Sequence, residues 1–162
     1  MRPRSMKALF FAAMLFCLQL VLSACGGGAA PSITIVSPAD GATIKGPKVK
    51  VEVTVANWQL APAGSPAAEG SGHLHFFVDT PSSAVPVGQA IPPTDANPAY
   101  IHAGKDPLTS RELTLSPGKH TITVVMGNTG HVALDTPAPK SITITVESVS
   151  YTHLTLPTIY SV

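Results

Sequence analysis

The chain has 162 residues, of which 44% are hydrophobic and only 12% are charged, with 13 Gly, 16 Pro and two Cys. This length suits one modest domain, and the composition excludes a large enzyme, a coiled coil and a disulfide-rich scaffold. The Gly and Pro content is above average but below the roughly 25–30% that marks a disordered low-complexity chain. We therefore expect a loop-rich domain built of strands.

The N-terminus has the pattern of an export signal. Basic residues at positions 2, 4 and 7 precede an apolar run over residues 8–22, and Leu22-Ser23-Ala24-Cys25 follows at its end. The run is shorter than the roughly 20 residues that a membrane-spanning helix needs. The segment resembles the lipobox of bacterial lipoproteins, in which a peptidase cuts before a cysteine that carries acyl chains. This resemblance implies a signal peptide over residues 1–24 and lipidation of Cys25.

Removal of this signal peptide changes the charge balance of the chain. It removes three of the 10 Lys and Arg and none of the 9 Asp and Glu, which leaves a formal net charge of −2. No basic run remains, so we expect no nucleic-acid partner and membrane contact through the lipid anchor only. With Cys25 acylated, the folded part has no thiol for a disulfide, a metal ligand or a nucleophile.

Residues 25–31 form the lipidated cysteine and a Gly-rich tether, and the domain is expected over residues 32–147. Residues 48–56 alternate most clearly, with valines at every second position opposite polar side chains. Strands are predicted over Ser32–Val36, Lys48–Ala56, His73–Asp79, Arg111–Leu115, Lys119–Met126 and Lys140–Glu147. Short alternating strands without a helical period predict an all-β domain, an Ig-like or fibronectin-like antiparallel β-sandwich.

Two segments interrupt the strand pattern, residues 59–71 and residues 80–110. The second is long for a loop without regular structure and holds six prolines. It is either a cover over a functional surface or a region that contains further strands.

Candidate chemistry lies in the segment Gly72-His73-Leu74-His75-Phe76-Phe77-Val78-Asp79. Residues two apart on a strand share a face, so His73 and His75 lie together, opposite the apolar set that contains Leu74 and Phe76. Alternate side chains are about 6.5–7 Å apart along a strand, and two imidazoles at this spacing can tilt toward one metal ion. Two ligands alone do not make a site.

Further ligands must come from elsewhere in the chain. His102 lies in the long segment that would fold over the His73 and His75 face, and His131 follows a turn after a predicted strand. Asp79 is a candidate carboxylate ligand. His120 shares the parity of inward-facing residues in its strand and is expected to have a structural role.

Imidazole ligands without thiolate suit Cu²⁺ or Zn²⁺, so we expect a divalent metal, copper or zinc, at His73, His75, His131 and His102. The same spacing also fits histidines that hydrogen-bond to loop backbone without metal. In that alternative the domain is a metal-free structural module that contacts an envelope protein or a polysaccharide.

Four segments resemble an uncharacterised bacterial family, numbered 4399 among the domains of unknown function. They are Pro38–Gly41, Gly72–His75, Leu115–Thr121 and Gly130–Val132. The family usually has three successive histidines where this chain has His73, Leu74 and His75. The resemblance implies an exported Ig-like domain with a site marked by histidines. A narrower likeness, confined to the eight residues of the His-x-His strand, is to copper–zinc superoxide dismutase, which makes a dismutase a remote alternative.

The last residues, 148–162, follow a strand that has the character of a domain end. They resemble translated sequencing-adapter read-through, and their authenticity is doubtful on that ground; read as a natural sequence, Thr152–Leu156 would be one more strand. No motif for catalysis is found elsewhere, since the chain lacks a nucleophile elbow, a phosphate loop and an HExxH motif. We expect a lipid-anchored, extracytoplasmic binding module of the bacterial cell envelope, and not an enzyme.

Overall fold

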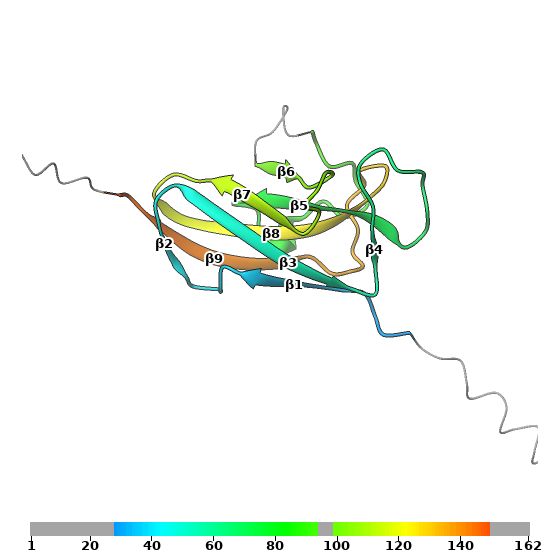
Figure 1. The fold of residues 1–162 in the computed structure, drawn as a ribbon, viewed down its shortest axis with the longest axis horizontal. Coiled ribbons are helices and arrows are strands. Elements are labelled where there is room, and N and C mark those ends of the chain that lie inside the picture. The colour runs from blue at the N-terminus through cyan, green and yellow to red at the C-terminus, as the bar shows by residue number, and fades with distance from the viewer. Residues whose placement is uncertain (1–27, 94–98, 150–162) are drawn as a thin grey trace, which may run out of the picture.

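A computed structural model describes residues 28–93 and 99–149, which form two β-sheets packed face to face (Figure 1). The smaller sheet has the order β1-β3-β7, with β1 at Ser32–Ser37, β3 at Lys48–Ala56 and β7 at Ser110–Thr114. The predicted signal peptide, Cys25 and nearly all of the doubtful tail lie outside the described residues. No helix within residues 28–93 and 99–149 is long and apolar enough to cross a bilayer.

The larger sheet has the order β2-β9-β8-β5-β4, with β6 also paired to β5. Its strands are β2 (Thr43–Lys45), β4 (Gln59–Leu60), β5 (Ser71–Val78), β6 (Tyr100–His102), β8 (Gly118–Asn128) and β9 (Lys140–Glu147). The prediction of an all-β sandwich is confirmed. The main pairings are antiparallel, but β2 pairs with β9 and β4 with β5 in parallel. These two- and three-residue strands are too short to show an alternation in the sequence.

The main core lies between the two sheets. Val49, Val51 and Val53 of β3 are buried there, as their alternation predicts, together with Leu74 and Phe76 of β5. Burial of apolar side chains is the main favourable contribution to folding. The described residues contain no cysteine, so no disulfide adds to it. The other face of β3 is exposed to solvent.

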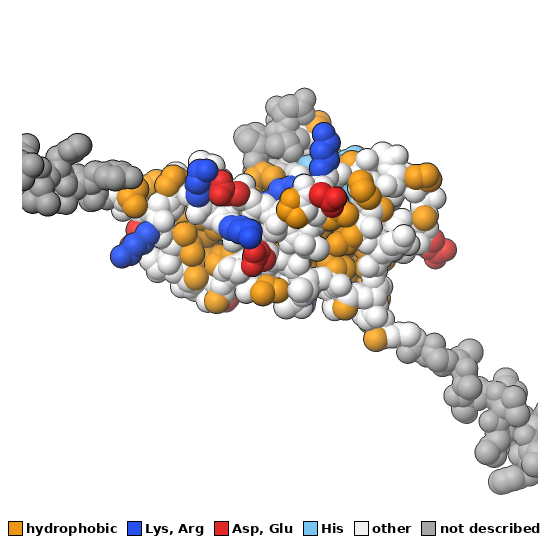
Figure 2. All heavy atoms as spheres, in the orientation of Figure 1, with side chains coloured by type: hydrophobic (Ala, Val, Ile, Leu, Met, Phe, Trp, Pro, Cys, Tyr) orange, Lys and Arg blue, Asp and Glu red, His pale blue; other side chains and the backbone are white. Residues whose placement is uncertain are grey.

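On that exposed face Lys48 contacts Glu112 at 2.9 Å and Lys50 contacts Glu52 at 2.6 Å. Figure 2 shows positive and negative side chains interspersed over this side of the molecule. Exposed pairs of this kind contribute little to stability, so the smaller sheet is held mainly by its buried face.

Strand β5 is buried on both faces. Leu74 and Phe76 face the main core, whereas Phe77 belongs to a second apolar cluster on the opposite face. The other buried members of this second cluster are Val85, Ile91, Val125 and Ala133. Three of the five cluster members, therefore, come from outside the sheet and cover it.

The cover is the long segment after β5, which holds the short 3-10 helix η1 (Ser82–Ala84) and strand β6. Ile91 donates a backbone hydrogen bond to the His131 carbonyl at 2.7 Å, and Ala90 forms a bridge with Val132. Both interpretations of this segment thus apply, since it covers a sheet face and contains one strand that the sequence pattern did not predict.

Candidate metal centre

The structure brings together the four histidines named from the sequence. His73 and His75 project from β5, His102 from β6, and His131 lies in the loop after β8. Each offers one ring nitrogen such that these four atoms lie within 4.8 Å of one another. The ring centroids of all six pairs are 4.5–5.6 Å apart.

Sheet register explains how three of these side chains meet. His102 lies directly opposite His75 in the antiparallel β5–β6 ladder, so the two rings share a face and are stacked at 5.0 Å. His73 lies two residues earlier on the same face of β5. His73 is paired with Gly127 near the end of β8, so the loop that follows β8 begins next to the cluster.

The loop that carries His131 is held by Asn128, the last residue of β8. The Asn128 side-chain oxygen accepts hydrogen bonds from the backbone N–H groups of Gly130 and Val132, both at 2.9 Å. The His131 N–H donates to the Asn128 carbonyl at 2.9 Å. His131 adopts a left-handed backbone with φ of 62°, which is uncommon for a residue with a side chain and fixes where its ring points.

The segment after His102 is held by Arg111 of β7, which belongs to the other sheet. Its Nε donates to the His102 carbonyl at 3.1 Å, and its terminal nitrogens donate to the carbonyls of Lys105, Pro107 and Ser110 at 2.6–2.8 Å. The planar guanidinium presents several donors in a fixed geometry, which suits it to binding a set of carbonyls.

Two glycines leave room for the rings. A Cβ atom at Gly127 would lie 2.8 Å from the His75 ring, and one at Gly104 would lie 2.2 Å from the His102 ring. Both distances are shorter than real Cβ contacts. Any larger residue at either position must displace a histidine.

The rings of His73 and His75 are buried without hydrogen bonds. Their side chains lie in residues that are 0% and 2% exposed, and none of their four ring nitrogens has a partner among the described residues. The backbone of Ala61 is close enough to His73 to favour its charged form, but it does not reach hydrogen-bonding geometry. Buried polar atoms are normally paired, and each unpaired one costs about 1–3 kcal/mol.

This burial keeps the imidazoles neutral. Desolvation, with smaller effects of the neighbouring rings, lowers the pKa of His73 to about 4 and that of His75 to about 2. Desolvation also lowers the pKa of His102, and His131 and Arg111 add to the effect. At neutral pH these three rings are uncharged, so each has a nitrogen lone pair available to bind a cation.

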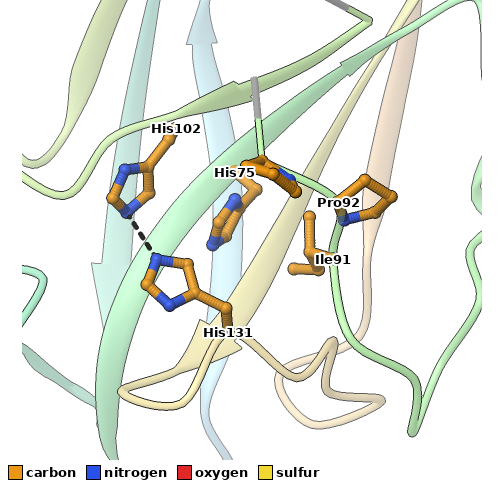
Figure 3. A pocket seen from close by; sticks show the side chains of 6 residues that line it. His75, Ile91, Pro92, His102 and His131 are labelled. Carbon is orange, nitrogen blue, oxygen red and sulfur yellow. Dashed lines mark hydrogen bonds between the residues drawn. The ribbon is translucent and has the colours of Figure 1, made fainter. Parts of the chain in front are cut away.

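The cluster opens into a pocket of about 260 Å³ (Figure 3). Its walls are His75, Ile91, Pro92, Pro93, His102 and His131. Figure 3 shows the rings of His102 and His131 pointing toward each other, and their Nε2 atoms are 3.2 Å apart. His73, which is fully buried, is not among these walls.

Two interpretations from the sequence need correction. Asp79 is not part of the cluster, because it adopts a left-handed backbone with φ of 57° directly after β5 and leaves the alternation of the strand. Its carboxylate accepts a hydrogen bond from His120 Nδ1 at 3.0 Å. For His75 the interpretation of a hydrogen bond to loop backbone is also wrong, because neither of its ring nitrogens has a partner among the described residues, whereas the backbone of Ala61 lies near the His73 ring. His120, which also bonds the Ser116 carbonyl, has the structural role expected.

Sequence reasoning missed the residues that support the cluster. Two of them, Arg111 and Asn128, hold backbone groups of the loops that carry the ligands. The other two, Gly104 and Gly127, leave space for the rings. Neither role has a sequence motif that could be recognised. The Asn-x-Gly-His segment was a detectable signal, because Asn and Gly favour a tight turn that would hold the following histidine in place.

Comparison with known proteins gives a family. The chain resembles the Clostridium thermocellum CbhA fibronectin(III)-like modules at 16% identity, over 73% of this chain and 99% of that one, with a TM-score of 0.43. It resembles a crystallised engineered protein at 15% identity, over 74% of this chain and 20% of that one, with the same TM-score. No curated protein matches.

The family model of DUF4399, a domain of unknown function, matches residues 51–147. This range covers more than half of the chain and includes all four histidines, though it begins within β3 and leaves out β1 and β2. The chain therefore belongs to the DUF4399 family.

Proposed function

We propose that this domain binds one divalent transition-metal ion, Cu²⁺ or Zn²⁺, through His73, His75, His102 and His131. The observation that carries the proposal is the set of four unpaired, buried ring nitrogens on two adjacent histidines, with two further histidines beside them. A metal ion at their centre would pair one nitrogen of each ring. This pairing would offset the free-energy cost of burying these ring nitrogens without hydrogen-bond partners.

The distances support coordination after small side-chain movements. Metal–imidazole bonds of about 2.0–2.1 Å place tetrahedral ligand atoms roughly 3.3–3.4 Å apart. The Nε2 atoms of His102 and His131, at 3.2 Å, already have this separation, and the four atoms as a group lie within 4.8 Å. The separations of up to 4.8 Å among the four nitrogens would have to shorten to this value on binding.

The donor set limits the class of metal. Four neutral imidazoles without thiolate or carboxylate suit Cu²⁺ or Zn²⁺ better than Mg²⁺ or Ca²⁺, which prefer oxygen ligands. The domain over residues 32–147 contains a single methionine, Met126, and this side chain is buried in the main core. A thioether site for Cu(I) is therefore not supported.

We propose a lipid anchor at Cys25 and an extracytoplasmic position at the bacterial envelope, on the basis of the lipobox-like sequence. Cells fed labelled palmitate should then incorporate the label into the parent chain and not into Cys25→Ala. Absence of label in the parent chain would contradict this anchor. In this setting the domain acts as a binding module for metal and not as an enzyme.

Calorimetric titration tests the metal site. The full chain in detergent micelles is titrated with Zn²⁺ and Cu²⁺, beside the variant His73→Ala/His75→Ala and the control His120→Ala. We expect one ion per chain with affinity tighter than micromolar, lost in the double variant and kept in the control. A folded parent chain that binds neither ion would reject the proposal and favour the metal-free module that contacts an envelope protein or polysaccharide.

A further inference from the structure

The four histidines do not enclose the proposed metal position on all sides. His75, His102 and His131 line the pocket, while the buried His73 contacts the rings of His102 and His131 without lining it. Four protein ligands already complete a tetrahedral site, but a zinc site can expand to five ligands. The pocket of about 260 Å³ in front of three of the four rings leaves room for such a fifth ligand.

Among the described residues, no acidic side chain lines the pocket. Its remaining described walls are Ile91, Pro92 and Pro93. Asp79, the carboxylate ligand considered from the sequence, instead accepts hydrogen bonds from His120 and from the backbone N–H of Thr121. A divalent ion held by four neutral imidazoles would keep its full charge of +2 in a partly buried site. Such a charge is costly unless an opposite charge accompanies it.

We infer that the pocket admits a small anionic ligand that coordinates the metal directly. This inference rests on the proposed function, because the metal supplies the charge that attracts the anion. The volume equals that of about nine water molecules at about 30 Å³ each, so a ligand of up to about nine non-hydrogen atoms fits. Its donor atom faces the three histidines, and any apolar part lies against Ile91 and the prolines. Short carboxylates and simple inorganic monoanions fit this description.

Azide is the probe for this position. The full chain in detergent micelles is loaded with one equivalent of Cu²⁺, and the visible ligand-field absorption of copper is recorded before azide is added. We expect azide to produce a new azide-to-copper charge-transfer band that saturates at one azide per copper. An unchanged spectrum at saturating azide would overturn the open position while leaving the metal site intact. Absence of the initial copper absorption would instead reject the metal site itself.

Two substitutions in the same covering segment locate the azide. Pro93→Trp places a large ring at the exposed rim of the pocket, whereas Val87→Trp places it at an exposed position that does not line the pocket. With azide titrations normalised to bound copper, we expect at least a tenfold weaker azide affinity in Pro93→Trp and no change in Val87→Trp. Equal azide affinity in Pro93→Trp and the parent chain would overturn the assignment to this pocket.

Discussion

The carbonyl oxygen of His102 accepts a hydrogen bond from Arg111 Nε at 3.1 Å, which links a candidate metal ligand on the larger sheet to a strand of the smaller one. Arg111 also binds three carbonyls of the segment between them. The two sheets thus hold the ligand set in common, and the position of His102 depends on a side chain that does not contact the site's pocket.

Replacement of Arg111 by Lys tests this dependence. Lysine keeps the charge, but its single ammonium group does not match four carbonyls. We expect metal affinity to fall by about tenfold and the free energy of unfolding to fall by about 1–3 kcal/mol through lost hydrogen bonds. Titration calorimetry and urea denaturation measure the two effects. Lys50→Arg on the same sheet is the control, and a stability loss with unchanged affinity would show that Arg111 does not position the ligand.

The unpaired nitrogens of His73 and His75 predict an unusual response to substitution. Without metal, His73→Leu/His75→Leu should raise the free energy of unfolding by about 1–3 kcal/mol per unpaired group removed, because apolar side chains of similar size need no partner. The same variant should lose stabilisation by metal. Urea denaturation in chelator, with and without added Zn²⁺, measures both changes.

His120 provides the matched comparison for that experiment. Its ring bonds both Asp79 and Ser116, so His120→Leu should lower stability in the same chelator buffer. If the His73 and His75 variant loses stability to the same degree, the two buried histidines are structural and the interpretation of them as unpaired metal ligands fails.

Gly127 is predicted to be essential for the position of His75. An added Cβ would lie 2.8 Å from the His75 ring, so Gly127→Ala should displace that ring and weaken metal binding by at least tenfold. Gly28→Ala, where no atom lies within 4 Å of the added Cβ, is the control. Metal titration of both variants measures the effect, and parent-like affinity in Gly127→Ala would show that the ring does not need this space.

The pairing of His120 with Asp79 predicts a pH dependence that is independent of the metal. Burial alone would lower the pKa of His120, but the hydrogen bonds to Ser116 and Asp79 and the charge of Asp79 outweigh it and raise the pKa. Because the folded pKa lies above the unfolded value near 6.5, this stabilisation is full below pH 6.5 and is lost as the pH rises through the folded value.

Asp79→Asn should remove the part of that contribution that comes from Asp79 and keep the part that comes from Ser116. NMR titration of the His120 ring protons should give a lower midpoint in Asp79→Asn than in the parent chain. The thermal stability of the variant should differ most from the parent near pH 6 and less at higher pH. A His120 midpoint that does not change on this substitution would contradict the assigned cause.

Several features of the fold were predictable because they depend on local pattern. The alternation of β3 fixed which valines are buried, and the parity of β5 placed His73 and His75 together opposite Leu74 and Phe76. The pairing of His102 with His75 was not predictable, because it depends on the register of a three-residue strand that follows a long segment. Burial of both histidines also depends on that segment, whose contacts are distant in sequence.

The measurement that tests the account most directly is X-ray absorption spectroscopy at the metal edge of the loaded full chain. We predict a first shell of nitrogen or oxygen atoms at about 2.0–2.1 Å, with outer-shell scattering from four imidazole rings. The His73→Ala/His75→Ala variant should lose this signature. A first shell that contains sulfur, or outer-shell scattering from fewer than three imidazoles in the parent chain, would contradict the four-histidine site.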